Sequence, residues 1–270
     1  MALPPPAPDR TCLVPGASSG IGVELARCLA RRGHGVTLVA RRQDRLDAAA
    51  AELAGLGIRA EVIVADLADA DQRRAIAGRV AELGLTVDVL VNNAGVTTSG
   101  PVHRGDRERE VAMVRIDVEA VVDLCSTFVP DMAGRGRGAV LNVASTAAFQ
   151  PLPGQAGYGA SKAFVLSYTE ALAAELRGTG VTATVLCPGP VNTDFGAAGG
   201  IAEEDATEAL PKVMWLPAGD VARAGVDGLA RGRRVVIPGS VNRLSAFAAG
   251  VAPHSVILRI LARQHPSMRP

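Results

Sequence analysis

Tyr158 and Lys162 are the residues whose types and spacing most directly suggest chemistry. Residues four positions apart lie on one face of a helix, one turn from each other. A phenol ordinarily titrates near pH ~10, and a fixed ammonium beside it favours the phenolate and lowers its pKa. Tyr158 is therefore a candidate general acid/base. The alternative is an ordinary pair of helix-surface neighbours, although the chain has only two tyrosines and two lysines.

A glycine-rich turn lies between an apolar strand candidate, Thr11–Val14, and a helix candidate, Ile21–Arg32. Glycines permit a tight turn and a close approach of the backbone to a phosphate, and a helix amino terminus supplies amide donors and a positive dipole. This strand–turn–helix context predicts a dinucleotide site, unless the glycines are purely structural. The candidate phosphate-binding residues are Gly16, Ser18, Ser19, Gly20, Ile21 and Gly22.

Two arginines follow the next predicted strand, Gly35–Ala40. In dinucleotide-binding folds an acid at this place binds the adenosine ribose hydroxyls, whereas an arginine accommodates a 2′-phosphate. The run Ala40-Arg41-Arg42 lacks the acid and offers two guanidinium groups suited to phosphate. The sequence therefore favours NADP(H) over NAD(H), unless Arg41 and Arg42 are ordinary surface charges.

The rest of the sequence alternates short apolar strand patterns with longer helical ones. Such alternation is typical of an α/β fold with a doubly wound, mostly parallel, seven-stranded sheet of the Rossmann type. We expect a single domain over residues 11–240. The further strands are predicted at Arg59–Ala65, Asp88–Val91, Gly138–Ala144, Val181–Leu186 and Arg233–Ile237, and the further helices at Gln43–Leu56, Asp69–Leu83, Arg104–Met132, Gly157–Arg177 and Asp220–Ala230.

The two ends of the chain fall outside this rhythm. The proline-rich residues 1–10 predict a short disordered or extended lead-in and do not resemble a signal peptide. Residues 241–270 form a C-terminal extension. Its apolar stretch Leu244–Ala262 is interrupted by Pro253 and Arg259, which argues against a membrane span. It is expected to pack on the body or on a sister subunit, to form a lid, or to make weak interfacial contact with a membrane.

Composition excludes several classes of function. A net charge of +1 lacks the large excess of positive charge that is typical of proteins that bind nucleic acid. The cysteines and histidines are dispersed, so we expect no metal site. Reduced thiols in apolar runs are typical of a cytoplasmic protein. The four cysteines are Cys12, Cys28, Cys125 and Cys187.

Further motifs complete a recognisable series over residues 10–240. After the glycine turn come Asp66-Leu67, Asn92-Asn93-Ala94-Gly95, Ser145 thirteen residues before Tyr158, the Tyr158/Lys162 pair, and Pro188-Gly189-Pro190-Val191-Asn192-Thr193. In this order and at these spacings the sequence resembles the short-chain dehydrogenase/reductase family, as an NADP(H)-preferring member of bacterial type.

The resemblance implies a role for each matching residue. Tyr158 would protonate a carbonyl oxygen during reduction or deprotonate an alcohol during oxidation, and Ser145 would hydrogen-bond that oxygen. Lys162 would lower the pKa of Tyr158 and bind the nicotinamide ribose. The implied cofactor contacts are Asp66 and Leu67 at the adenine, Asn93, Ala94 and Gly95 beside the adenosine ribose, and Pro188, Gly189, Val191 and Thr193 at the nicotinamide.

Two positions depart from the family pattern. Pro15 stands where the family has a threonine before the first glycine, and it removes an amide donor. Asp117 stands where the family has an asparagine of the proton relay, so it joins the candidate catalytic residues. If its negative charge reached Tyr158 and Lys162, it would raise the pKa of both. We therefore expect weakened or pH-shifted catalysis.

The sequence leaves the substrate open. Residues 146–155 and 194–216 are small and apolar, and the second stretch is expected to cover the substrate. An uncharged ketone or aldehyde therefore fits best, reduced by NADPH or formed in the reverse reaction. The alternatives are a 3-oxoacyl-thioester reductase of lipid metabolism and a non-catalytic dinucleotide-binding protein. The resemblance further implies a homodimer or homotetramer that pairs through the helices Arg104–Met132 and Gly157–Arg177.

Overall fold

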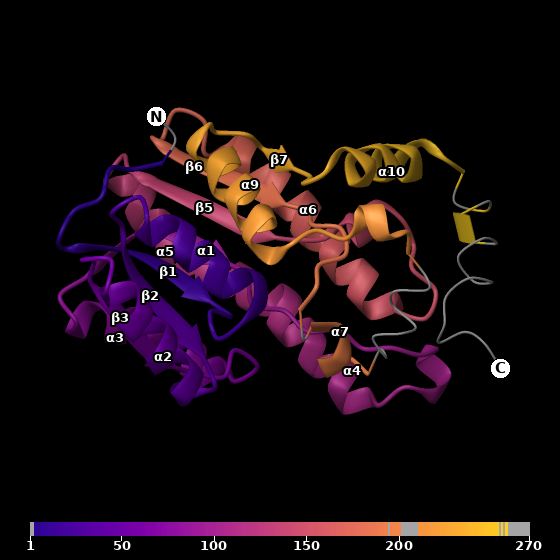
Figure 1. Cartoon of the computed structure of the whole chain (residues 1–270), viewed down its shortest axis with the longest axis horizontal. Helices are drawn as coiled ribbons and strands as arrows, with labels where there is room; N and C mark the ends of the chain where they lie inside the picture. Colours follow the sequence, from indigo (N-terminus) through magenta and orange to yellow (C-terminus); the bar gives the residue numbers. More distant parts are fainter. Residues whose placement is uncertain (1–2, 194, 201–209, 254, 256, 259–270) are drawn as a thin grey trace.

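One parallel sheet organises the chain in the computed structural model, which describes residues 3–193, 195–200, 210–253, 255 and 257–258 (Figure 1). Its strand order is β3-β2-β1-β4-β5-β6-β7, and every adjacent pair of strands is parallel. This confirms the doubly wound α/β prediction. The strands are β1 (Arg10–Pro15), β2 (Gly35–Ala40), β3 (Ala60–Val64), β4 (Thr86–Asn92), β5 (Gly138–Val143), β6 (Val181–Leu186) and β7 (Val235–Val236).

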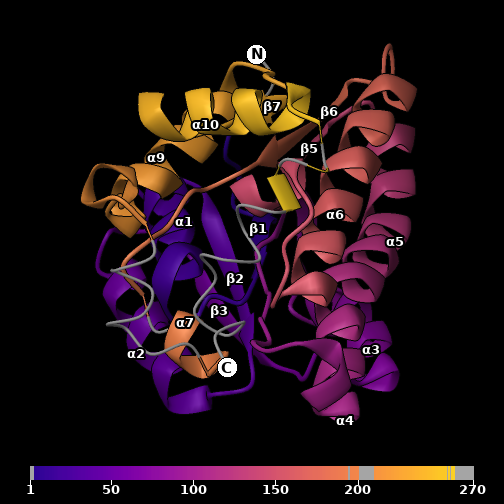
Figure 2. The same cartoon turned by 90° about the vertical axis from the view of Figure 1, so that its right-hand side faces the viewer.

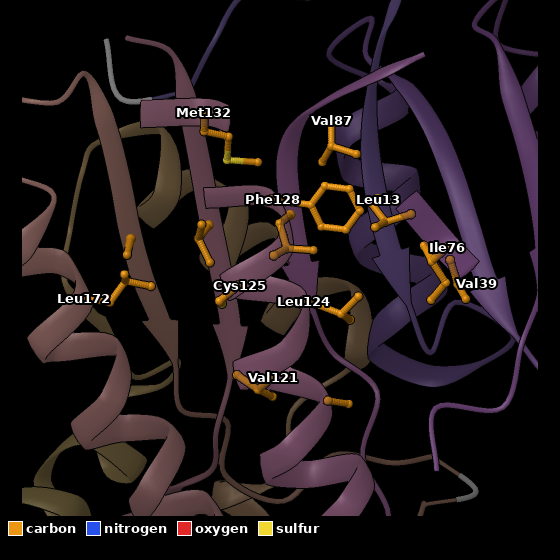
Figure 3. Packing of buried hydrophobic residues seen from close by; sticks show 14 of the residues in the cluster. Leu13, Val39, Ile76, Val87, Val121, Leu124, Cys125, Phe128, Met132 and Leu172 are labelled. Atoms are coloured by element: carbon orange, nitrogen blue, oxygen red, sulfur yellow. The ribbon is translucent and has the colours of Figure 1, made fainter. Parts of the chain in front are cut away.

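Helices cover both faces of this sheet (Figure 2). One layer contains α1 (Gly20–Ala30), α2 (Gln43–Ala54) and α9 (Ala218–Ala230), and the other contains α3 (Ala70–Glu82), α5 (Ala120–Gly134) and α6 (Ala156–Glu175). Alternate strand residues supply the two cores, because successive side chains of a strand point to opposite faces. Leu13 packs against Phe128 and Leu124 on the second face (Figure 3), whereas Cys12 and Val14 belong to the first.

The predicted helix Arg104–Met132 is helical from Arg107 on but is not a uniform α-helix. After a short turn η1 (Val102–Arg104), helix α4 (Arg107–Val114), a π-helical turn η2 (Arg115–Glu119) and α5 follow one another without a break. Asp106 caps α4 by accepting hydrogen bonds from the amides of Glu108 and Arg109 at 2.8 and 3.3 Å. π-Helical turns occur mostly as single interruptions of longer helices and are frequent at functional sites. Asp117 lies in this one.

The described residues of the lead-in pack against the body of the protein. Leu3 contacts the core, the carbonyl of Pro5 accepts a hydrogen bond from Arg137 at 2.6 Å, and the carbonyl of Asp9 accepts one from Thr86 at 3.0 Å. The final strand, β7, covers only two of the five residues expected. Its short pairing with β6 leaves Arg233 outside the strand, although the Arg233 carbonyl still accepts a hydrogen bond from Thr184.

After β6 the chain contributes short elements near the carboxyl ends of the strands. These are α7 (Phe195–Ala198), η4 (Lys212–Met214) and, after β7, α10 (Ser240–Val251). Residues 194 and 201–209 of the expected substrate-covering segment lie outside the described residues, as do 259–270 of the C-terminal extension. Among the helices that the structure describes, none has the length and apolar character needed to cross a membrane.

Candidate active site

Tyr158 and Lys162 lie one turn apart on α6, as their spacing predicts. The Lys162 Nζ is 5.6 Å from the centre of the Tyr158 ring, and Lys162 is almost fully buried, at 4% exposure. The ammonium forms an ion pair with Asp117, with Nζ 2.9 Å from Oδ2, and donates a hydrogen bond to the Val143 carbonyl at 3.4 Å. An exposed surface pair would have no such partners, so the surface alternative is excluded.

Asp117 reaches this pair with its side chain. Its carboxylate is completely buried, and Oδ1 accepts a hydrogen bond from the Val96 amide at 2.8 Å. Gly95 packs directly on the ion pair, because a Cβ placed there would lie 3.1 Å from the Lys162 Nζ and 3.4 Å from the Asp117 Oδ1. The turn after β4 therefore needs glycine at Gly95 to leave room for the pair.

Burial and charge set the pKa of each group. Burial raises the pKa of Tyr158; Lys162 and a hydrogen bond with Ser145 lower it, and Asp117 raises it again, so that it ends above the ordinary value of a phenol. Burial lowers the pKa of Lys162, but Asp117 and Tyr158 together raise it above its usual range. Burial raises the pKa of Asp117 against the opposing effect of Lys162. The sequence predicts that Lys162 lowers the pKa of Tyr158, but it does not predict that burial outweighs this effect.

Ser145 follows the end of β5, on the same side of the sheet as Tyr158. Its hydroxyl accepts a hydrogen bond from the Ala147 amide at 3.1 Å, which begins the short turn η3 (Thr146–Phe149). The Thr146 amide donates to the Pro188 carbonyl at 2.8 Å, so the turn is fixed to the segment after β6. Ser145, Tyr158, Lys162 and Asp117 thus converge from β5, α6 and η2.

The glycine turn is held by main-chain contacts that make up for Pro15. The Gly16 amide donates to the Val39 carbonyl at 2.8 Å, and the Asn93 side-chain amide donates to the carbonyls of Pro15 and Gly16 at 3.3 and 3.2 Å. Gly16 has φ +77°, and a Cβ there would lie 2.7 Å from the Ala94 Cα. Only glycine suits that close approach.

The amino terminus of α1 is left available for an anion. Asp69 and Asp106 cap α3 and α4 with their carboxylates, but Ser19 makes no side-chain cap on α1, and the first turn of α1 contains no acid. Uncapped amides at a helix amino terminus favour a phosphate group. The turn from Gly16 through Ser18, Gly20, Ile21 and Gly22 therefore fits a dinucleotide pyrophosphate.

Arg41 and Arg42 lie beside this turn. Arg42 donates hydrogen bonds to the hydroxyls of Ser18 and Ser19 at 3.0 and 3.2 Å. The Arg41 guanidinium is 3.8 Å from the Asp66 carboxylate and is two-thirds exposed. Asp66 also accepts a hydrogen bond from the Ala68 amide at 2.9 Å, which orders the turn that contains Leu67. Two cations and the Asp66 carboxylate thus lie close to the glycine turn.

The segment Pro188–Thr193 packs against a residue that sequence reasoning missed. A Cβ at Gly189 would lie 2.5 Å from the Asn242 side chain, which is buried and donates to the carbonyls of Met214 and Pro238 at 3.0 and 3.2 Å. Val191 pairs with Leu216, and the Thr193 Cγ2 is 3.3 Å from where a Gly20 Cβ would lie. Asn242 therefore joins three segments, and no local pattern could have found it.

One residue of the expected substrate-covering segment, Phe195, contacts Tyr158. The Phe195 ring is 5.8 Å from the Tyr158 ring, at a tilt of 53°. Beneath it, the Gln155 side chain donates to the Thr97 hydroxyl at 2.8 Å, which ties the two walls of the site together. A hollow of about 450 Å³ lies between η3, the loop of residues 150–153 and the side of α6 that faces away from Tyr158.

Comparisons with known proteins agree with this geometry. A family model described as short chain dehydrogenase matches residues 10–203. A short chain dehydrogenase of Pseudocercospora fijiensis is 37% identical over 70% of this chain, which spans only 62% of that relative. An uncharacterised oxidoreductase of Myxococcus xanthus is 39% identical, and the match covers 70% of this chain and 74% of that relative. A solved short-chain dehydrogenase from Sphingobium yanoikuyae in complex with NADPH superposes with a TM-score of 0.79 at 33% sequence identity. The match covers 88% of this chain and 91% of that one.

The fold and the site define a dinucleotide-dependent oxidoreductase with a Rossmann-type sheet. The chain belongs to the short-chain dehydrogenase/reductase family, as its motifs predict. Its cofactor is a nicotinamide dinucleotide. Among the described residues, no group of three or more histidine, cysteine, aspartate or glutamate side chains could hold a metal ion.

Proposed function

We propose that this protein reduces an apolar ketone or aldehyde with NADPH. The observation that carries the proposal is the convergence of Ser145, Tyr158 and Lys162 with the buried Asp117, beside a groove that fits a dinucleotide. A non-catalytic dinucleotide-binding protein would have no need for a buried charge pair next to a tyrosine. Burying such a pair costs desolvation free energy, which a binding role does not explain.

The preference for NADP(H) rests on Arg41 and Arg42. Both guanidinium groups lie at the end of β2, next to the glycine turn, where a 2′-phosphate would extend from the adenosine ribose. The partners of Arg42 are neutral hydroxyls and the contact of Arg41 is long and exposed, so both groups can turn to a phosphate at little cost. The S. yanoikuyae relative, in complex with NADPH, supports the same preference.

Each catalytic side chain then has one task. When bound, the nicotinamide exchanges a hydride with the carbonyl carbon. The Tyr158 hydroxyl donates its proton to the carbonyl oxygen, and Ser145 donates a hydrogen bond that stabilises the charge developing on the same oxygen. Lys162 favours the phenolate that is left behind. Asp117 holds the Lys162 ammonium in its buried position at 2.9 Å.

The raised pKa of Tyr158 favours carbonyl reduction at neutral pH. A phenol whose pKa lies above the ordinary value of about 10 keeps its proton near pH 7 and can act as an acid. Oxidation of an alcohol needs the phenolate as a base, whose population grows only as the pH rises. Asp117 therefore biases the site toward reduction by opposing the effect of Lys162 on Tyr158.

The class of substrate follows from the walls of the site. Phe195 places an aromatic ring beside Tyr158, and η3, which follows Ser145 directly, has the small and apolar sequence Thr-Ala-Ala-Phe. These walls suit an uncharged carbonyl compound. A 3-oxoacyl thioester is a second substrate class to test. The predicted homodimer or homotetramer and the predicted cytoplasmic location stay predictions.

A carbonyl panel tests the proposal directly. NADPH oxidation would be followed with ketosteroids, diketones, aldehydes and 3-oxoacyl thioesters, and Tyr158→Phe would be the matched control for each compound. The proposal predicts turnover of at least one apolar ketone or aldehyde by the native protein and its loss in the variant. If the protein turned over only acyl thioesters, its substrate class would be 3-oxoacyl thioesters and not apolar ketones or aldehydes. NADPH binding without turnover of any compound would favour a non-catalytic role.

A further inference from the structure

Helix α10 presents its large apolar side chains to the outside. Leu244 is 70% exposed, Phe247 68% and Val251 67%. At 3.6 residues per turn these three lie within about 60° of one another around the helix, and the buried Asn242 and Ala246 lie on the opposite side. The usual amphipathic arrangement is therefore inverted, because the small and amide side chains face the protein.

The inward face explains how α10 can be held in this orientation. The Asn242 side-chain amide donates to the carbonyls of Met214 and Pro238, so a buried hydrogen-bond network fixes the helix without its large apolar residues. The helix contacts η3 and η4, and both views place it at the edge of the molecule (Figures 1 and 2). In η4, Val213 is also 66% exposed. Clustered exposed side chains of this size mark an interaction surface.

Two cationic side chains lie at this surface. Among the described residues, Arg243 lies next to the apolar stripe on α10, and Lys212 lies in η4; both are exposed. Apolar side chains bordered by arginine and lysine are the pattern of helices that lie in the interface of a membrane containing anionic lipids.

We propose that α10 docks the protein onto the surface of an anionic lipid bilayer. The stripe of Val241, Leu244, Phe247 and Val251 would enter the headgroup region, and Arg243 would contact the headgroups. A second copy of the chain is a poorer partner for this face. A twofold contact would bring the Arg243 and Lys212 side chains of two copies to the same interface, like charge against like charge.

Co-sedimentation of the full chain with vesicles tests this docking. The vesicles would be phosphatidylcholine alone or phosphatidylcholine with phosphatidylglycerol. The variant Leu244→Gln/Phe247→Gln changes only exposed side chains, and Leu56→Gln, at a half-exposed site beyond α2, is the matched control. We expect binding to the anionic vesicles that weakens in high salt, and a loss of about 10²-fold in the double variant. Leu56→Gln should bind like the native protein.

Three results would overturn the proposal. One is no sedimentation of the native protein with anionic vesicles, and another is equal binding by the double variant. The third is a lower molar mass of the double variant by light scattering, because it would assign this face to a contact between copies of the chain. Thermal unfolding followed by circular dichroism would verify that the variants fold. The readout is binding and not turnover, so its failure leaves the proposed reductase function untouched.

Discussion

The two ends of the proposed cofactor site handle charge in opposite ways. At the catalytic end, Asp117 and Lys162 are buried and contact each other at 2.9 Å. At the phosphate end, Arg41 and Arg42 are exposed, and the hydrogen bonds of Arg42 go to neutral serine hydroxyls. Buried charges depend on each other, because losing one leaves the other unpaired away from water, whereas solvent screens exposed charges.

The difference between buried and exposed charges indicates a different role for each end, one in the fold and proton transfer and the other in ligand binding. The catalytic end is part of the fold, since its ion pair joins η2 to α6 and lies beneath Gly95. The phosphate end contributes little to folding, so its cations can be used for a ligand. Changes at the catalytic end should therefore affect stability and proton transfer, and changes at the phosphate end should affect cofactor affinity.

Tyr158→Phe should have the largest effect on turnover. It removes the proton donor while keeping the ring that packs on Phe195. We expect a fall in kcat of about 10²–10⁴-fold, the range contributed by a positioned general acid. NADPH affinity, measured by fluorescence titration, should stay within about twofold. A variant that kept its turnover would remove Tyr158 as the acid.

Lys162→Met should cause the largest loss of stability. It leaves the Asp117 carboxylate buried without its partner, which ordinarily costs about 3–5 kcal/mol. Urea denaturation near pH 7 measures the free energy of unfolding. Arg41→Met is the control from the exposed end and should change it by less than about 0.5 kcal/mol. If both variants lost the same free energy of unfolding, the buried charge and the exposed charge would contribute equally to stability, which would contradict the comparison.

Arg41→Met combined with Arg42→Met should reverse the preference for the cofactor. Each charge-assisted contact to a 2′-phosphate contributes about 1.5–3 kcal/mol, so NADPH affinity should fall at least tenfold, while NADH affinity should hardly change. Calorimetric dissociation constants for both cofactors measure this effect. If native protein bound both equally tightly, the two arginines would be ordinary surface charges.

Asp117→Asn should shift the pH dependence of the reaction toward lower pH, because it removes the charge that raises the pKa of Tyr158. Without the carboxylate the pKa of Tyr158 falls, so carbonyl reduction should begin to decline at a lower pH, and alcohol oxidation should begin to rise at a lower pH. Profiles of kcat/KM against pH in both directions measure the shift. Asp220→Asn, at an exposed site on α9, should leave both profiles in place. Identical profiles for Asp117→Asn and native protein would show that Asp117 has no influence on Tyr158.

The sequence predicts the parallel sheet and the glycine turn because both depend on local patterns. Strand β2 and the start of α2 fall at their predicted residues, since apolar runs and turn residues decide them locally. The π-helical turn at Asp117 could not be predicted, because the helical pattern of Arg104–Met132 continues through it. Asn242 was missed because its partners, Met214 and Gly189, lie far away along the chain.

The net direction of the Tyr158 pKa also needed the structure. Spacing alone identifies Lys162 as the neighbour that lowers it. Only the packing shows that burial, together with the fully buried Asp117, outweighs that effect.

Direct titration of Tyr158 tests the central claim most closely. The chain has two tyrosines, so a Tyr168→Phe background leaves Tyr158 as the only phenol that can ionise. Ultraviolet absorbance of the phenolate would follow this titration with and without Asp117→Asn. We predict a Tyr158 pKa above the ordinary value of about 10, and a lower pKa when Asp117 is replaced. A pKa below that value, or one unchanged by Asp117→Asn, would contradict the claim that burial and Asp117 keep Tyr158 protonated as the acid of carbonyl reduction.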